Sequence, residues 1–178
     1  MAYARISLDD VIGPRPRPAL VHQLAAGAVA GQVGGGAFAV IAIGLCRVFL
    51  RTSGFFPMQA IAASMTDPHA VEGVNPDAFI IGLLIHQLVP SLAWGLVFGA
   101  LVWAVRPRRN AGLTLLGLAV GLVAWLVDVE LLVPALAHNP DLWNSAIPLP
   151  IGLLAHLAYG LGLSLLPWKF DPIARTFD

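Results

Sequence analysis

Long apolar stretches dominate the hydrophobic pattern of the chain. Four of them reach the length of about 20 residues that a helix needs to cross a bilayer. They occupy residues 20–50, 79–105, 111–134 and 148–168. A chain of 178 residues is too short to bury such runs in a soluble core. The pattern therefore predicts an all-α, polytopic membrane protein with a bundle of four transmembrane helices across residues 20–168.

The segments between these runs are more polar. Residues 51–78 form the longest connection, and within it residues 57–65 fit a short helix in the membrane interface, ended by Asp67 and Pro68. Residues 135–147 contain an Asn-Pro step, which favours a turn. These segments are short, so the sequence predicts one transmembrane domain without a soluble partner domain.

Composition supports this assignment. The chain is 58% hydrophobic and 11% charged, whereas a soluble domain carries about 25% charged residues. The formal net charge is zero, which gives no indication of nucleic acid as a partner. The one cysteine, Cys46, excludes an intrachain disulfide and any cysteine-based metal centre.

The basic residues predict the orientation. With the N-terminus inside, the inner side carries eight of the ten basic residues and the outer side only Arg47 and Arg51. The inner set is Arg5, Arg15, Arg17, Arg106, Arg108, Arg109, Lys169 and Arg175. We therefore expect an N-in, C-in membrane protein, with residues 1–19 and 169–178 on the inner side and residues 51–78 outside.

Glycines recur at spacings that bring helices together. In lipid, helices gain no hydrophobic free energy from contact, so close approach of their backbones must supply the attraction. The candidate packing positions are Gly27, Gly31, Gly34 and Gly35 in the first span, Gly95 and Gly99 in the second, and Gly160 in the fourth. This pattern indicates a helix–helix contact, either inside the bundle or against another subunit.

Two pentapeptides suggest an internal repeat. The second span contains Ser91-Leu-Ala-Trp-Gly95 and the fourth contains His156-Leu-Ala-Tyr-Gly160. Both would run from the outer side inwards, as expected if a helical hairpin had been duplicated.

Ionisable residues inside the spans are the candidates for chemistry, because burying them in a membrane is costly. These candidates are His86, Asp128, Glu130 and His156. At about 1.5 Å per residue, Asp128 lies about 28 Å above the inner basic residues, His86 about 30 Å and His156 about 20 Å. The histidines and carboxylates therefore gather in the outer half of the bundle, with His156 about 10 Å deeper than the others.

Several kinds of site fit these residues. Imidazole and carboxylate together suit a transition metal or a proton-exchange pair. His86 and His156 could be axial ligands of haem b, although their difference in depth disfavours it. Asp128 and Glu130 are two residues apart on a helix, so at most one of them faces a given site. A structural or interfacial role without any cofactor remains the simplest interpretation.

The fourth span carries a resemblance. Its stretch from Leu153 to Gly162 resembles a motif of small four-helix bacterial membrane proteins of unknown function, in which histidine, two residues, an aromatic and glycine recur in the second and fourth spans. Here Ser91 stands where the second-span histidine would be, and His86 lies five residues earlier. The resemblance implies a four-helix fold in the bacterial inner membrane and no particular activity.

Three functions follow as hypotheses. The favoured one is a non-catalytic accessory subunit of a larger integral membrane complex in energy conversion, such as electron transport, with the bilayer and other membrane subunits as partners. The second is a haem b- or metal-binding protein that uses His86 and His156. The third is a small transporter or channel with Asp128 and Glu130 at its outer mouth. No motif of a known catalytic centre is present, so we expect no enzyme.

Overall fold

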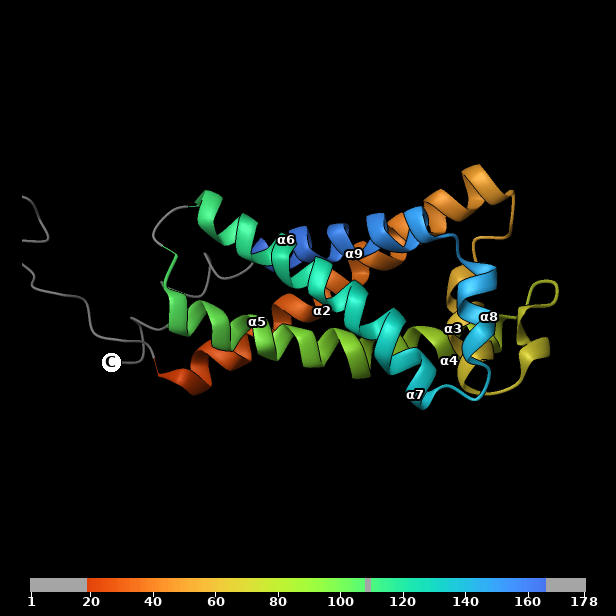
Figure 1. The fold of residues 1–178 in the computed structure, drawn as a ribbon, viewed down its shortest axis with the longest axis horizontal. Coiled ribbons are helices and arrows are strands. Elements are labelled where there is room, and N and C mark those ends of the chain that lie inside the picture. Colours follow the sequence, from red (N-terminus) through yellow and green to blue (C-terminus); the bar gives the residue numbers. More distant parts are fainter. Residues whose placement is uncertain (1–18, 108–109, 166–178) are drawn as a thin grey trace, which may run out of the picture.

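A computed structural model describes residues 19–107 and 110–165, and within these ranges all regular structure is helical. The long helices run side by side between two ends of the molecule (Figure 1). One end holds the start of α2 and the connection from α5 to α6. The other end holds a group of short helices. The expected cytoplasmic segments, apart from Ala19, lie outside the described residues.

The first span consists of α2 (Leu20–Leu45) and a wide π turn, η1 (Cys46–Leu50). The second consists of α4 (Pro76–His86), η3 (Gln87–Ser91) and α5 (Leu92–Val105). The third consists of α6 (Asn110–Val127), η4 (Asp128–Leu132) and α7 (Val133–Leu136). Between the first two lie α3 (Phe56–Met65) and the 3-10 turn η2 (Pro68–Val71), and the chain continues through α8 (Pro140–Ala146) to α9 (Leu149–Ser164).

Three helices of the described part are long and apolar enough to cross a membrane. They comprise Leu20–Leu50, Pro76–Val105 and Asn110–Leu136. The fourth expected span differs from these, because α8 and α9 meet at an angle of 94°. The break falls at Ile147 and Pro148, where proline ends one helix and begins the next. Counted together, this bent pair gives a fourth segment that could cross the membrane. Residues 166–168, the last three of the span expected from the sequence, lie outside the described ranges.

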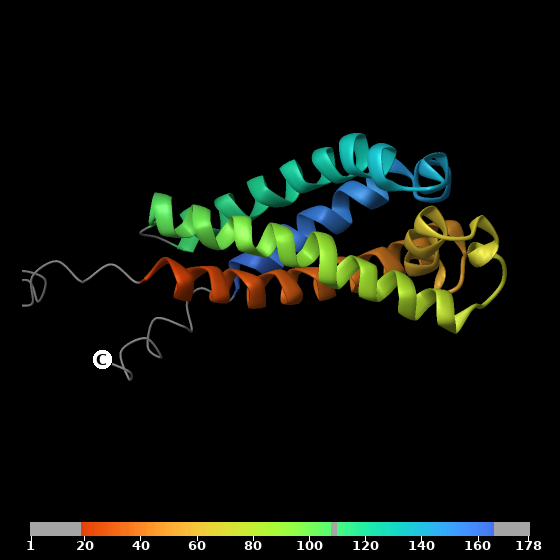
Figure 2. The same cartoon turned by 90° about the horizontal axis from the view of Figure 1, so that it is seen from below.

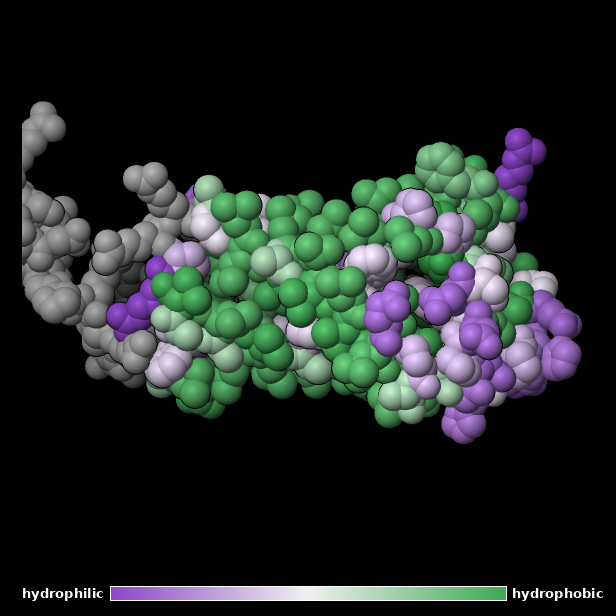
Figure 3. Space-filling model, viewed as in Figure 1, coloured by the Kyte–Doolittle hydropathy of each residue, from purple (hydrophilic) through white to green (hydrophobic). Residues whose placement is uncertain are grey.

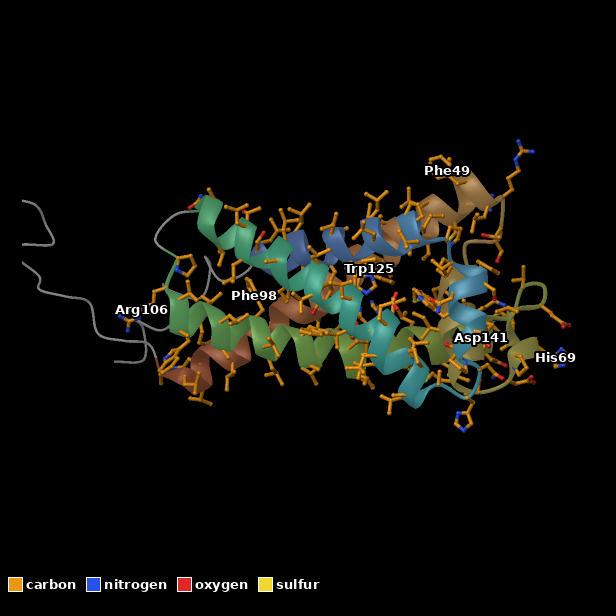
Figure 4. The ribbon with its side chains drawn as sticks, in the orientation of Figure 1. Phe49, His69, Phe98, Arg106, Trp125 and Asp141 are labelled. Carbon is orange, nitrogen blue, oxygen red and sulfur yellow. The ribbon has the colours of Figure 1, made fainter. Side chains whose placement is uncertain are left out.

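The surface agrees with a membrane location. A broad hydrophobic band covers the long helices, and hydrophilic residues gather over the end with the short helices (Figure 3). Side chains at the two ends are polar, with Arg106 at one end and His69 and Asp141 at the other (Figure 4). The molecule therefore has the surface of a multi-pass membrane protein.

Helix α2 packs against both α5 and α9, and glycines form both contacts. A Cβ atom on Gly27 or Gly31 would collide with the backbone of the second span, at Gly95 and Gly99 of α5 or at Ser91, the last residue of η3. Further along α2, a Cβ on Gly34 would lie 2.9 Å from the carbonyl oxygen of Tyr159 in α9. The glycine stripe expected from the sequence therefore makes helix–helix contacts inside the bundle.

A second glycine contact joins α6 and α9. A Cβ on Gly117 or Gly121 would meet the carbonyl oxygen of Gly160 or His156. The pentapeptide glycines therefore occupy similar positions: Gly95 packs against the first span, and Gly160 packs against the third. This similarity is consistent with duplication of a helical hairpin, which stays a prediction.

Helices α3 and α8 lie at one end of the bundle, with α3 beside α4 (Figures 1 and 2). A Cβ on Gly82 of α4 would collide with the carbonyl oxygen of Met58, so α3 and α4 are in close backbone contact. Asn139 joins α8 to α3, because its side-chain nitrogen donates to the carbonyl oxygen of Ala63 at 3.0 Å and its backbone N–H donates to that of Ser64 at 2.9 Å. Residues 57–65 are thus helical, and most of their side chains are buried.

Substitution of Gly31 by alanine should destabilise the fold. The added Cβ would collide with the carbonyl oxygen of Ser91 and lie 2.9 Å from the Cα of Gly95. Overpacking of this kind costs about 1–3 kcal/mol. Gly44→Ala is the matched control, since nothing lies within 4 Å of that position. Unfolding in detergent, followed by circular dichroism, should show a loss of stability for Gly31→Ala alone, and equal stability of the two variants would contradict the packing.

Candidate functional site

Wide π turns interrupt the second and third spans where the polar residues lie. Turn η3 contains Pro90, which lacks an N–H group and cannot continue a regular helix. Turn η4 begins at Asp128. Such π turns occur frequently at functional sites, because they change the direction in which side chains leave the helix.

Polar side chains from neighbouring helices bind carbonyl groups at both ends of η3. The side-chain nitrogen of Gln32 donates to the carbonyl oxygen of Gln87 at 2.9 Å. The hydroxyl of Tyr159 donates to the carbonyl oxygen of Ser91 at 3.0 Å. A broken helix within a membrane is tolerated when neighbours supply such hydrogen bonds. Gln32 and Tyr159 therefore fix η3 against α2 and α9.

Asp128 is the centre of a partly buried polar group. Its Oδ1 accepts a hydrogen bond of 2.9 Å from the indole nitrogen of Trp94. Its Oδ2 lies 3.8 Å from Nε2 of His156. Nδ1 of His156 lies 2.8 Å from the carbonyl oxygen of Gly152, one turn earlier in α9. Helices α5 and α9 and the turn η4 thus meet through three side chains.

The backbones of Asp128 and His156 lie at different depths, as counting residues predicts. The close partner of the His156 carbonyl is Gly121, seven residues before Asp128 or about 10 Å along α6. The side chains nevertheless meet. Helices α6 and α9 are antiparallel, and side chains tilt towards the N-terminus of their own helix. Asp128 and His156 therefore lean towards each other, so the difference of about 10 Å in backbone depth does not keep their side chains apart.

His86 lies beside this pair without joining it by a close hydrogen bond. Its Nε2 is 3.4 Å from Oγ of Ser91, beyond the usual range for hydrogen bonding. The ring of Phe38 contacts both imidazoles, with centroid distances of 4.4 Å to His86 and 4.9 Å to His156. Both histidines are 7% exposed. An aromatic ring from α2 therefore connects the two expected histidines.

A cavity of about 300 Å³ adjoins this polar group. His86, Asp128 and His156 contribute to its wall, together with the aromatic rings of Phe38, Trp94 and Trp143. Ile61, Ser64 and Met65 of α3 line it from the end with the short helices. Most other lining residues are aliphatic. This combination of an apolar cavity and a few convergent polar groups is typical of sites for small molecules.

Glu130 belongs to a different place. It lines a separate cavity of about 240 Å³ with Trp125, Trp143 and Asn144. Asp128 and Glu130 therefore face different cavities, as their spacing predicts, and the structure does not bring all four candidate residues together. Within residues 19–107 and 110–165, no three histidine, cysteine or acidic side chains are arranged to hold a metal ion.

The contacts also do not suit haem b. Nε2 of His156 is directed at Asp128, and Nε2 of His86 lies 3.4 Å from Oγ of Ser91. A cavity of about 150 Å³ holds one benzene molecule, so 300 Å³ accommodates a small ring compound and not a four-pyrrole macrocycle. The geometry therefore supports neither the haem nor the metal interpretation of His86 and His156.

Sequence reasoning missed Trp94, Phe38 and Tyr159 as members of the site. Trp94 and Asp128 are 34 residues apart, and no local spacing reports such a pair. Pro90 within an apolar span was the available signal, because it marks a broken helix that needs polar partners.

These features define an all-helical, multi-pass membrane protein with a partly buried polar group beside an apolar cavity. Residues 21–174 match the family of unknown function DUF6789, and the chain belongs to that family. Membership agrees with the resemblance to uncharacterised proteins, and it assigns no activity. Comparison with curated proteins and with solved structures gives no match.

The hydrogen bond between Trp94 and Asp128 should be measurable as a coupling energy. In a double-mutant cycle with Trp94→Phe and Asp128→Leu, we expect an interaction of about 0.5–2 kcal/mol in the free energy of unfolding. The control is the same cycle with Glu130→Leu in place of Asp128→Leu, since Glu130 lines the other cavity. Equal coupling of Trp94 to both carboxylates would contradict the described contact.

Proposed function

We propose that this protein binds a small lipophilic molecule with a ring-sized head group, taken up from the bilayer into the cavity beside Asp128 and His156. The observation that carries this proposal is the cavity itself, with a carboxylate and an imidazole on an otherwise mostly apolar wall. Two such groups are costly to keep inside a membrane. A ligand that uses them gives a reason for that cost.

The arrangement in the membrane belongs to the same proposal. Four spans, the last of them the bent α8–α9 pair, leave both termini inside, as the distribution of eight and two basic residues favours. The cavity then lies in the outer half of the bundle, because α3 lines it at the end that carries Arg47 and Arg51. In this orientation α3 and α8 lie at the outer end of the bundle.

Entry from the lipid side is supported by the residues at the edge of the cavity. Val89 and Val97 on the second span are 60% and 42% exposed, and Leu132 and Leu136 on the third are 37% and 63% exposed. All four line the cavity. Since the surface of these spans faces lipid in a bilayer, the cavity opens between the second and third spans towards the hydrocarbon.

Blocking this opening should abolish binding. Two probes of suitable size are para-hexylphenol and para-hexylanisole, and we expect at least one of them to bind the full chain in lipid nanodiscs at one molecule per protein. Ala93→Trp should prevent binding, because Ala93 is exposed and lines the cavity. Leu96→Trp, on the same helix and outside the cavity, is the matched control.

Binding can be measured by equilibrium dialysis against nanodiscs that contain lipid only, which corrects for partition of the probes into lipid. If neither probe binds above that level, or if Ala93→Trp and Leu96→Trp bind equally, the proposed function is wrong.

An accessory role in a larger membrane complex is the second candidate. It is supported by two glycines of α2 that the bundle does not use: nothing lies within 4 Å of a Cβ placed on Gly36 or Gly44. Val40 lies between them on the same stripe and is 68% exposed. Small residues on an outward face allow another helix to approach closely.

For this second candidate, Gly36→Leu with Gly44→Leu should release the protein from membrane subunits that co-purify in mild detergent. The fold should be retained, since both positions are open. The released chain is expected at its monomer mass in native mass spectrometry. A wild-type protein that is already monomeric after extraction from its own membrane would exclude the accessory role.

A further inference from the structure

The hydrogen bond of His156 to its own helix fixes which ring nitrogen carries a proton. Nδ1 lies 2.8 Å from the carbonyl oxygen of Gly152. A carbonyl oxygen can only accept, so Nδ1 must donate. In the neutral imidazole, Nε2 is then an acceptor, and it is Nε2 that faces Asp128 and the cavity.

Asp128 presents a second acceptor at the same point. Its Oδ1 is already bound by Trp94, whose indole N–H can only donate. The remaining oxygen, Oδ2, lies 3.8 Å from Nε2 of His156, too far for a direct hydrogen bond. Two groups that are both able to accept therefore face each other across a gap on the wall of the cavity.

A hydroxyl group fits this gap. Hydrogen-bond lengths to a hydroxyl oxygen are about 2.8 Å, and two atoms 3.8 Å apart can both lie at that distance from a third. The hydroxyl donates its proton to Asp128 or His156, and it can accept one from the imidazolium when His156 is charged. An ether oxygen at the same point would have no proton to donate to either group.

The rest of the wall suits an aromatic ring. Phe38, Trp94 and Trp143 surround the cavity, and aromatic pairs gain from offset or edge-to-face contact. Its volume of about 300 Å³ is about twice that of a cavity for one benzene molecule. The opening between exposed aliphatic side chains leaves room for an apolar tail in the lipid.

We propose that the Asp128–His156 pair recognises the hydroxyl of a lipophilic phenol, whose ring lies among Phe38, Trp94 and Trp143 and whose tail extends into the bilayer. This inference rests on the proposed function and adds the class of ligand. The hydroxyl is the feature that distinguishes the ligand from other ring compounds dissolved in the membrane.

The test compares para-hexylphenol with para-hexylanisole, its methyl ether, on the full chain in nanodiscs. A hydrogen bond to a charged group contributes about 1.5–3 kcal/mol, so we expect the phenol to bind at least about tenfold more tightly. Asp128→Leu should lower this ratio through a loss of phenol affinity, because only the His156 acceptor remains, while affinity for the ether stays unchanged. His156→Phe, which keeps a ring at that position, provides a second variant if Asp128→Leu does not fold.

The outcomes separate the two proposals. Equal affinity for phenol and ether, abolished for both by Ala93→Trp, would overturn the hydroxyl assignment and leave the binding function in place; it would also indicate that water fills the gap. A preference for the phenol that survives undiminished in both Asp128→Leu and His156→Phe would also overturn the hydroxyl assignment. If neither probe binds the wild-type protein, the binding function fails, and the phenol inference fails with it.

Discussion

Close approach of helix backbones is the constraint on which this structure depends. In lipid, side-chain burial alone gives helices little reason to associate. Here glycines let α2 contact both α5 and α9, and let α6 contact α9, at distances that a single added Cβ would prevent. The two contacts on α2 place the second and fourth spans on either side of it. The polar residues of these spans then lie within reach of the third span.

Within this packing, the π turns η3 and η4 form the site. Pro90 prevents a regular helix at η3, and the hydrogen bonds from Gln32 and Tyr159 stabilise the broken backbone at a fixed position. Asp128 is the first residue of η4, where the indole of Trp94 donates a hydrogen bond to it. The site is therefore a consequence of irregular backbone held by polar neighbours, which a membrane permits only inside protein or at a cavity.

The sequence predicts the long helices well and the site only in part. Apolar length alone identifies the first three long helices, and the small residues identify contacts between them. The spacing of Asp128 and Glu130 correctly separates their surroundings. Counting residues placed His156 and Asp128 in the same half of the bundle, but it could not show that their side chains meet, because that depends on the opposite tilt of side chains on antiparallel helices. The bend before α9 and the partnership of Trp94 with Asp128 depend on tertiary contacts that no local pattern contains.

The central claim is that His156 faces a ligand cavity through Nε2 while Nδ1 is held by the backbone. Solid-state NMR on ¹⁵N-histidine-labelled protein in lipid bilayers observes both nitrogens separately, and a His156→Phe sample assigns the signals. On addition of para-hexylphenol, we expect the Nε2 signal of His156 to shift and the Nδ1 signal to remain close to its original position. Shifts of equal size at both nitrogens, or none at either, would contradict the account.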